Sequence, residues 1–102
     1  MFDGYADHFN EEVRLVILKI LAEQSDGRLN DSMMLTVLET FAINRTREYL
    51  RTQLRWLADE GQAITISKVG TVWISELTQQ GEHHLARKVL IEGIKRPSRP
   101  KA

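Results

Sequence analysis

Apolar residues along this chain recur mostly at helical spacing and change to a two-residue period in one short region. The helical spacing predicts four helices, at about residues 11–23, 31–41, 45–60 and 78–94. The two-residue period falls between the third and the fourth of them. The pattern therefore predicts a mainly α fold with a small β-hairpin, in the order α-α-α-β-β-α.

The two-residue period indicates a pair of short strands. Ile64 and Ile66 alternate with hydroxyl-bearing residues, and Val72 and Ile74 alternate with other side chains in the same way. Gly70 lies in the segment between them and can take the positive φ that a tight hairpin turn requires. We therefore expect two strands joined by a short turn.

Capping residues and prolines set the expected limits of the folded unit. Asn10, followed by two glutamates, is a suitable N-cap for the first helix, and two prolines end regular structure near the C-terminus. We therefore divide the chain into an N-terminal extension (residues 1–10), one domain (residues 11–94) and a disordered basic tail (residues 95–102). The tail either stays free in solvent or adds phosphate contacts, and the sequence leaves both possibilities open.

Two of the predicted helices carry more apolar positions than one packing face can use. In the first helix, Leu15 and Leu18 lie opposite the main apolar face. The last helix likewise has apolar residues around much of its circumference. Because a chain of 102 residues has a thin core, we expect a homodimer that buries residues 11–23 and 78–94 between two copies.

The predicted third helix combines two neighbouring kinds of surface. Three leucines, at positions 50, 54 and 57, form an apolar stripe, while Arg47, Arg51 and Arg55 repeat every four residues beside it. The stripe would pack on the domain. The arginine row would either bind phosphate or lie in solvent, helped by ion pairs with Glu48, Asp59 or another helix, and the residues alone leave both possibilities open.

The order of elements resembles the winged helix-turn-helix superfamily, and two local patterns support the resemblance. The end of a recognition helix, just before the wing, is similar to residues 54–61, LRWLADEG. The segment that follows the wing in MarR- and PadR-like regulators is similar to residues 77–85, LTQQGEHHL. The resemblance covers roughly residues 11–92, and the short chain also looks like small phage or prophage proteins of this fold.

This resemblance implies sequence-specific binding of double-stranded DNA by a small transcriptional regulator, with the third helix in the major groove and the hairpin as the wing. The residues that it places against bases or phosphates are Arg45, Thr46, Arg47, Arg51, Thr52, Arg55 and Lys68. Winged helices also serve as protein-interaction modules. An adaptor that binds a protein and no DNA is therefore the alternative.

Charge does not decide between these two functions. The chain has 14 basic and 14 acidic residues and a formal net charge of zero, whereas a DNA-binding domain is usually basic. The charges are unevenly distributed, however: residues 1–26 hold six acids and two bases, and residues 27–58 hold five bases and three acids. Local potential governs phosphate contact more than the sum does. Zero net charge favours the adaptor, and the arginine row favours DNA.

Other classes of chemistry find little support in the sequence. The chain has no cysteine, no Gly-rich phosphate loop and no nucleophile-elbow motif, so we expect neither an enzyme nor a cofactor. Adjacent His83 and His84 diverge by about 100° on a helix, which disfavours a shared metal ion. The two tryptophans are expected to pack inside the fold. The lack of a secretory signal and of a long apolar run predicts a cytoplasmic protein without a membrane span.

Overall fold

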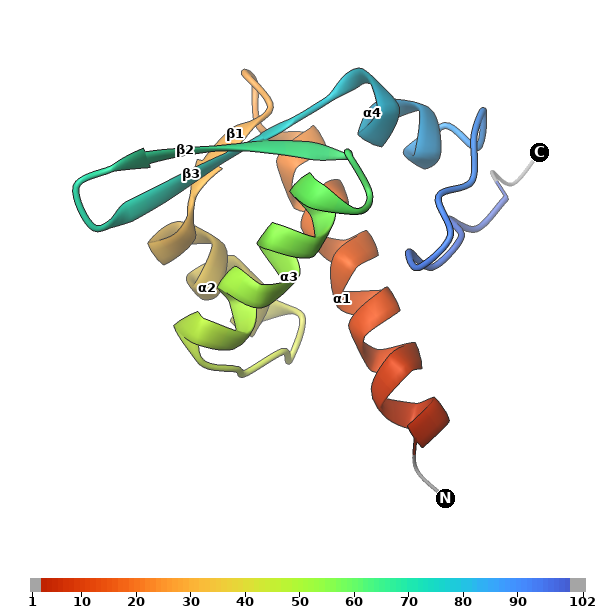
Figure 1. Ribbon diagram of the computed structural model, residues 1–102, viewed down its shortest axis with the longest axis horizontal. Coiled ribbons are helices and arrows are strands. Elements are labelled where there is room, and N and C mark those ends of the chain that lie inside the picture. Colours follow the sequence, from red (N-terminus) through yellow and green to blue (C-terminus); the bar gives the residue numbers. More distant parts are fainter. Residues whose placement is uncertain (1–2, 100–102) are drawn as a thin grey trace.

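The computed structural model describes residues 3–99 as four helices and one three-stranded antiparallel sheet. In chain order the elements are α1 (Asp3–Glu23), β1 (Arg28–Asn30), α2 (Asp31–Thr40), α3 (Arg47–Asp59), β2 (Ile64–Val69), β3 (Val72–Leu77) and α4 (Gln79–Leu85). The sheet lies along one side of the first three helices, and its hairpin extends past them (Figure 1). The fold is a small α+β domain that contains the expected α-α-α-β-β-α series and one further strand.

The first helix, α1, is surrounded by other elements along its C-terminal half. It packs against α2, α3, α4 and β3, so apolar residues on several of its sides are buried within one chain. Leu15 and Leu18 are only 4% and 0% exposed. The surplus apolar positions that predicted a dimer through residues 11–23 are therefore used inside the domain, and this reason for that interface is lost.

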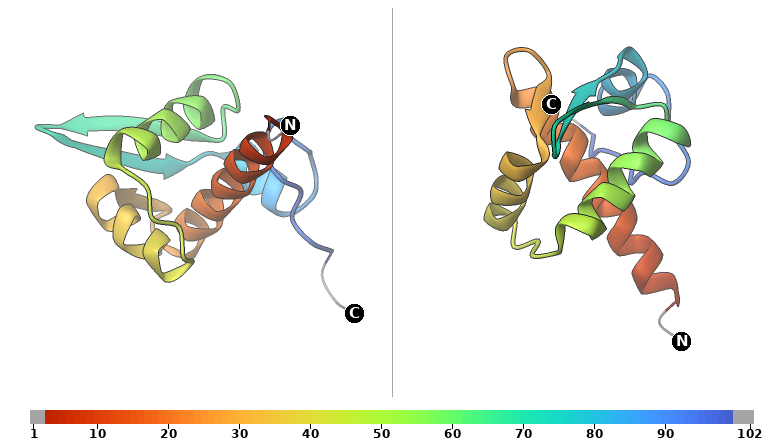
Figure 2. Two further views of the ribbon diagram at one scale, coloured as in Figure 1. Left: turned by 90° about the horizontal axis from the view of Figure 1, so that it is seen from below. Right: turned by 60° about the vertical axis from the view of Figure 1, so that its left-hand side comes forward.

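The expected start of the first helix at Glu11 is wrong, because α1 already begins at Asp3. Its N-terminal turns project from the rest of the domain (Figure 2). Asn10 is not an N-cap: its side-chain oxygen accepts a hydrogen bond from the Tyr49 hydroxyl of α3. Phe9 packs on the same tyrosine, with 6.1 Å between the ring centroids. These contacts support the helix before Asn10, so the expected N-terminal extension is helical from Asp3 onward.

The short strand β1 is not predicted from the sequence, because three residues are too few to show an alternating pattern. It pairs with β3, Leu29 lying opposite Ser75, and gives the sheet the order β1-β3-β2. The hairpin agrees with its prediction: Gly70 and Thr71 link the strands, and Gly70 has a φ of +60°. Since α2 follows β1 directly, the sheet ties the hairpin to the start of α2.

The connection between α2 and α3 is longer than expected, and α3 begins later. It runs from Phe41 to Thr46 and contains the buried Ile43. Thr46 is the N-cap of α3, and its hydroxyl accepts a hydrogen bond from the Tyr49 amide at 3.1 Å. Arg45 and Thr46, expected inside the helix, therefore precede it.

The last helix, α4, ends at Leu85 and not near residue 94, because the chain turns back over the buried His84. The Ile91 amide donates a hydrogen bond to His84 Nδ1 at 3.0 Å. Nε2 therefore carries the ring proton and donates to the Lys95 carbonyl oxygen, also at 3.0 Å. The imidazole thus forms hydrogen bonds with the backbone of residues 91 and 95 and holds this segment against the domain.

The segment predicted to be a disordered basic tail packs on the domain where it begins. The Lys95 amide donates to the Glu11 carbonyl oxygen at 3.2 Å, and its ammonium group lies 2.8 Å from the Glu12 carboxylate. Pro97 is buried, and its carbonyl oxygen accepts a hydrogen bond from Arg87. The prediction of disorder is therefore wrong for residues 95–97. Residues 100–102 lie outside the described part of the chain.

Candidate nucleic-acid interface

A buried aspartate at the start of α2 binds two of the three arginines in the predicted row. The Asp31 side chain is 0% exposed, and its Oδ2 lies 2.7 Å from Arg51 Nη2 and 3.0 Å from Arg47 Nη1. Its Oδ1 accepts a hydrogen bond from the Trp73 amide at 3.4 Å. Arg47 and Arg51 therefore turn toward α2 and β3, and they do not form one solvent-facing row with Arg55.

The Asp31 carboxylate is ionised in this arrangement. Burial alone raises its pKa, but hydrogen bonds from Arg51, Arg47 and the Trp73 amide outweigh this effect and leave the pKa below its ordinary value. One negative charge thus sits between two guanidinium groups. About half of the positive charge that the sequence assigned to Arg47 and Arg51 is neutralised from within the domain.

Three cations gather over a single indole ring, that of Trp73 in β3. The guanidinium carbons of Arg51 and Arg55 lie 4.6 and 5.6 Å from the ring centroid, and Lys68 Nζ lies 4.7 Å from it. Lys68 reaches the ring because it is the cross-strand partner of Trp73. The two arginines reach it because they are one turn apart on α3, which packs against β2. We call Arg51, Arg55, Lys68 and Trp73 the Trp73 cluster.

The Trp73 cluster has more positive charge than its surroundings neutralise. Among the salt bridges formed within residues 3–99, Arg51 takes part in one, whereas Arg55 and Lys68 take part in none. Both of these side chains are exposed. They flank a groove between α3 and β2 whose other walls include Ala58, Asp59 and the edge of the sheet. Converging cations of this kind raise the local positive potential and attract anionic groups.

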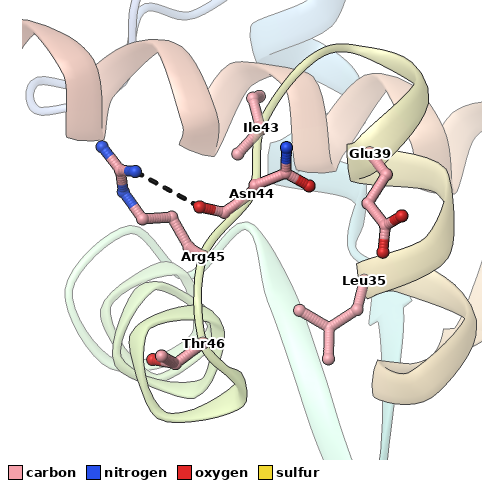
Figure 3. Close-up of a pocket in the computed structure, with 6 residues that line it drawn as sticks. All are labelled: Leu35, Glu39, Ile43, Asn44, Arg45 and Thr46. Carbon is pink, nitrogen blue, oxygen red and sulfur yellow. Dashed lines mark hydrogen bonds between the residues drawn. The ribbon is translucent and has the colours of Figure 1, made fainter.

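Arg45 and Thr46 lie just before α3, beside a hollow between α2 and the connection from α2 to α3 (Figure 3). The Arg45 guanidinium carbon lies 4.4 Å from the centroid of the Phe9 ring, and Arg45 donates a hydrogen bond to the Asn44 carbonyl oxygen at 3.2 Å. The Thr46 hydroxyl is used for capping. These two predicted contact residues are therefore separate from the Trp73 cluster.

On the side of α3 that faces away from the domain, four exposed residues follow one another at helical spacing: Glu48, Thr52, Arg55 and Asp59. We call them the outward row of α3, and this row is not predominantly basic. The Thr52 hydroxyl donates to the Glu48 carbonyl oxygen of its own helix, at 2.9 Å. One arginine and one threonine are thus available on this row, between two carboxylates.

The structure brings together only some of the predicted contact residues. Arg51, Arg55 and Lys68 meet in the Trp73 cluster, and Arg47 is held by Asp31. Sequence spacing could not identify the role of Asp31, because the residues that it binds lie at least 16 positions away along the chain. The spacing of the arginines indicated ionic contacts, but it could not show whether their partner is a phosphate or a carboxylate of the same chain.

The described residues contain no group of three or more His, Cys, Asp or Glu side chains placed to hold a metal ion. His84 in particular has both ring nitrogens occupied by backbone groups. Between residues 3 and 99, no helix combines the length and the apolar character needed to cross a bilayer.

Sequence comparison connects the chain to a phage protein. The uncharacterized protein gp26 of Escherichia phage Mu is 31% identical to it over 96 residues, which cover 94% of this chain and 97% of gp26. No family model matches the chain, and no solved structure matches it. Because the similarity extends over nearly the whole of both sequences, the chain belongs to the same family as gp26 of phage Mu.

Proposed function

We propose that the protein is a winged-helix protein that binds double-stranded DNA, with the Trp73 cluster as its main phosphate-binding surface. The observation that carries this proposal is the convergence of Arg51, Arg55 and Lys68, from α3 and the hairpin, on one indole ring. These are the two elements that the winged-helix resemblance places against DNA. The element order, with a hairpin of two strands and a two-residue turn following α3, supports the same assignment.

In this proposal α3 enters the major groove with its outward row. Thr52 and Arg55 reach base edges or the flanking phosphates, and Lys68 binds the phosphate backbone beside the hairpin. Asp31 holds the Arg51 guanidinium in one orientation, so that little side-chain entropy is lost when it binds a phosphate. Arg45, just before the first turn of α3, makes a further phosphate contact in this proposal.

The kinship with a phage Mu protein supports the view that this is a small phage or prophage protein. We propose transcriptional regulation as its use of DNA binding, in keeping with the resemblance to MarR- and PadR-like regulators. Regulation by a protein of this size would come from occupying a DNA site.

Replacing both Arg55 and Lys68 with glutamine should weaken binding to duplex DNA about 10-fold or more at moderate salt. Two fewer phosphate contacts should also flatten the log–log salt slope by about 2, from about −4 in the wild type. Fluorescence anisotropy against a pool of short random duplexes measures both quantities. The matched control replaces Lys19 and Lys88, which are exposed on other parts of the chain, with glutamine and removes the same charge.

An equal loss of affinity in the control would show that only total charge matters and would contradict the assignment to the Trp73 cluster. Failure of the wild type to bind DNA even at low salt would refute the proposed function. The adaptor would then be the better candidate. It is favoured by the two carboxylates on the outward row of α3, Glu48 and Asp59, and by the neutralisation of Arg47 and Arg51 by Asp31.

A further inference from the structure

One carboxylate lies on the side of α3 that the proposed function turns toward DNA. Glu48 is in the first turn of α3 and is the first residue of its outward row. In helix-turn-helix proteins the N-terminal residues of the recognition helix contact base edges in the major groove. The helix dipole favours a carboxylate in this turn, but it does so on any side of the helix. DNA that binds α3 by its outward row must therefore accommodate the Glu48 side chain.

Within residues 3–99, no salt bridge neutralises the Glu48 carboxylate. Its usual partner on a helix would be the arginine three residues later, but Asp31 holds the guanidinium group of Arg51. The Thr52 hydroxyl, four residues later, donates to the backbone carbonyl oxygen of Glu48 and not to its carboxylate. The carboxylate oxygens are therefore free to accept hydrogen bonds from a ligand.

A free carboxylate in the major groove is selective among bases. The phosphate backbone repels it whatever the sequence, so only a hydrogen-bond donor on a base edge offsets the repulsion. Cytosine presents its N4 amino group there and no acceptor of its own. Guanine and thymine present acceptors, and adenine presents the acceptor N7 beside its amino group. The base edge that best suits a carboxylate is therefore that of cytosine.

We infer that Glu48 selects a C·G base pair in the DNA site of this protein, with the cytosine N4 amino group donating to the carboxylate. The inference rests on the proposed function and adds a base identity to a surface described so far by phosphate contacts. It divides the roles along α3, because the Trp73 cluster supplies affinity and the first turn supplies selectivity. A negative group in the interface weakens binding to other sequences, which increases discrimination at the expense of overall affinity.

Glu48→Gln tests the inference, because a glutamine amide can form two hydrogen bonds with adenine, at N6 and N7. Bound duplexes are selected from a random pool with the wild type and with the variant. Fluorescence anisotropy then compares four duplexes that differ only at the position where the two selections differ. We expect the wild type to bind the cytosine duplex at least about 10-fold more tightly than the adenine duplex, and Glu48→Gln to reverse this preference. Glu48→Ala should bind all four duplexes within about 3-fold of one another.

The matched control is Glu23→Gln, which removes an exposed carboxylate at the end of α1. It should select the same sequence as the wild type. If Glu48→Gln also selects that sequence and merely binds every duplex more tightly, Glu48 only repels DNA and the inference is overturned. A wild type that binds duplexes without any sequence preference overturns it as well. Circular dichroism confirms that each variant is folded, as expected for substitutions at exposed positions.

Failure of this inference can be told apart from failure of the proposed function. DNA binding that depends on Arg55 and Lys68, combined with an unchanged base preference in Glu48→Gln, overturns the inference and leaves the proposed function standing. If the wild type binds no duplex even at low salt, both are overturned.

Discussion

Replacing Asp31 with asparagine should lower the free energy of unfolding by about 3 kcal/mol at neutral pH. The Asp31 carboxylate is fully buried and binds Arg47, Arg51 and the Trp73 amide at once. Asparagine keeps the shape but removes the charge, and its NH2 group must face either the two guanidinium groups or the Trp73 N–H, all of which are donors. Chemical denaturation of the wild type and the variant measures the difference.

The pH dependence of this difference follows from the lowered pKa of Asp31. Its ordinary value is 3.8, and the folded value lies below that. Ionised Asp31 therefore contributes its full stabilisation above the unfolded pKa, and the contribution is lost as pH falls through the folded pKa. The gap between wild type and Asp31→Asn should stay constant down to about pH 4 and narrow below it.

Glu39→Gln is the matched control, because Glu39 is an exposed carboxylate on the same helix. It should change stability by less than about 0.5 kcal/mol. Equal effects of the two substitutions, or a gap that widens in acid, would contradict the role assigned to Asp31.

Replacing Gly81 with alanine should lower the melting temperature by about 10 °C, or the free energy of unfolding by about 2 kcal/mol. A Cβ atom at this position would lie 2.4 Å from the Ala63 carbonyl oxygen and 2.7 Å from a methyl group of Leu77. The carbonyl cannot move freely, because it also accepts the Thr78 amide hydrogen bond at 3.0 Å. The first turn of α4 would have to shift away from the base of the hairpin.

The control for this prediction is Gly4→Ala. A Cβ atom at Gly4 meets nothing within 4 Å, and alanine is the better helix former, so the variant should be no less stable than the wild type. A thermal melt followed by circular dichroism compares the two variants. If Gly81→Ala melts like Gly4→Ala, α4 does not pack as closely on Ala63 and Leu77 as described.

Elements with a long hydrophobic pattern were predictable from the sequence, whereas short elements and element boundaries were less so. The hairpin and the leucine stripe of α3 follow from periodicities that extend over several residues, and the glycine of LTQQGEHHL has the steric explanation just given. Boundaries were less predictable where a distant contact decides them. α1 continues before Asn10 because α3 contacts it there, and α4 stops early because His84 binds the returning chain.

The sequence predicted three residues of the Trp73 cluster, Arg51, Arg55 and Lys68, but not their arrangement. The arginine row on α3 and Lys68 were identified, yet helical spacing cannot show that a buried carboxylate in α2 turns Arg47 and Arg51 sideways. Trp73 was predicted to pack, which agrees with its 9% exposure. Its second role, as the ring on which three cations converge, depends on strand register and helix packing, and these are tertiary features.

The most direct test of DNA binding by the Trp73 cluster is an NMR titration of the labelled protein with a short duplex selected from a random pool. We predict the largest shifts for the backbone amides from Arg51 to Asp59, for those of the hairpin around Lys68, and for the Trp73 indole N–H. The backbone amides of the projecting N-terminal turns of α1 should change little. Shifts confined to α1 or to α2, or no shifts at low salt, would contradict DNA binding by the Trp73 cluster.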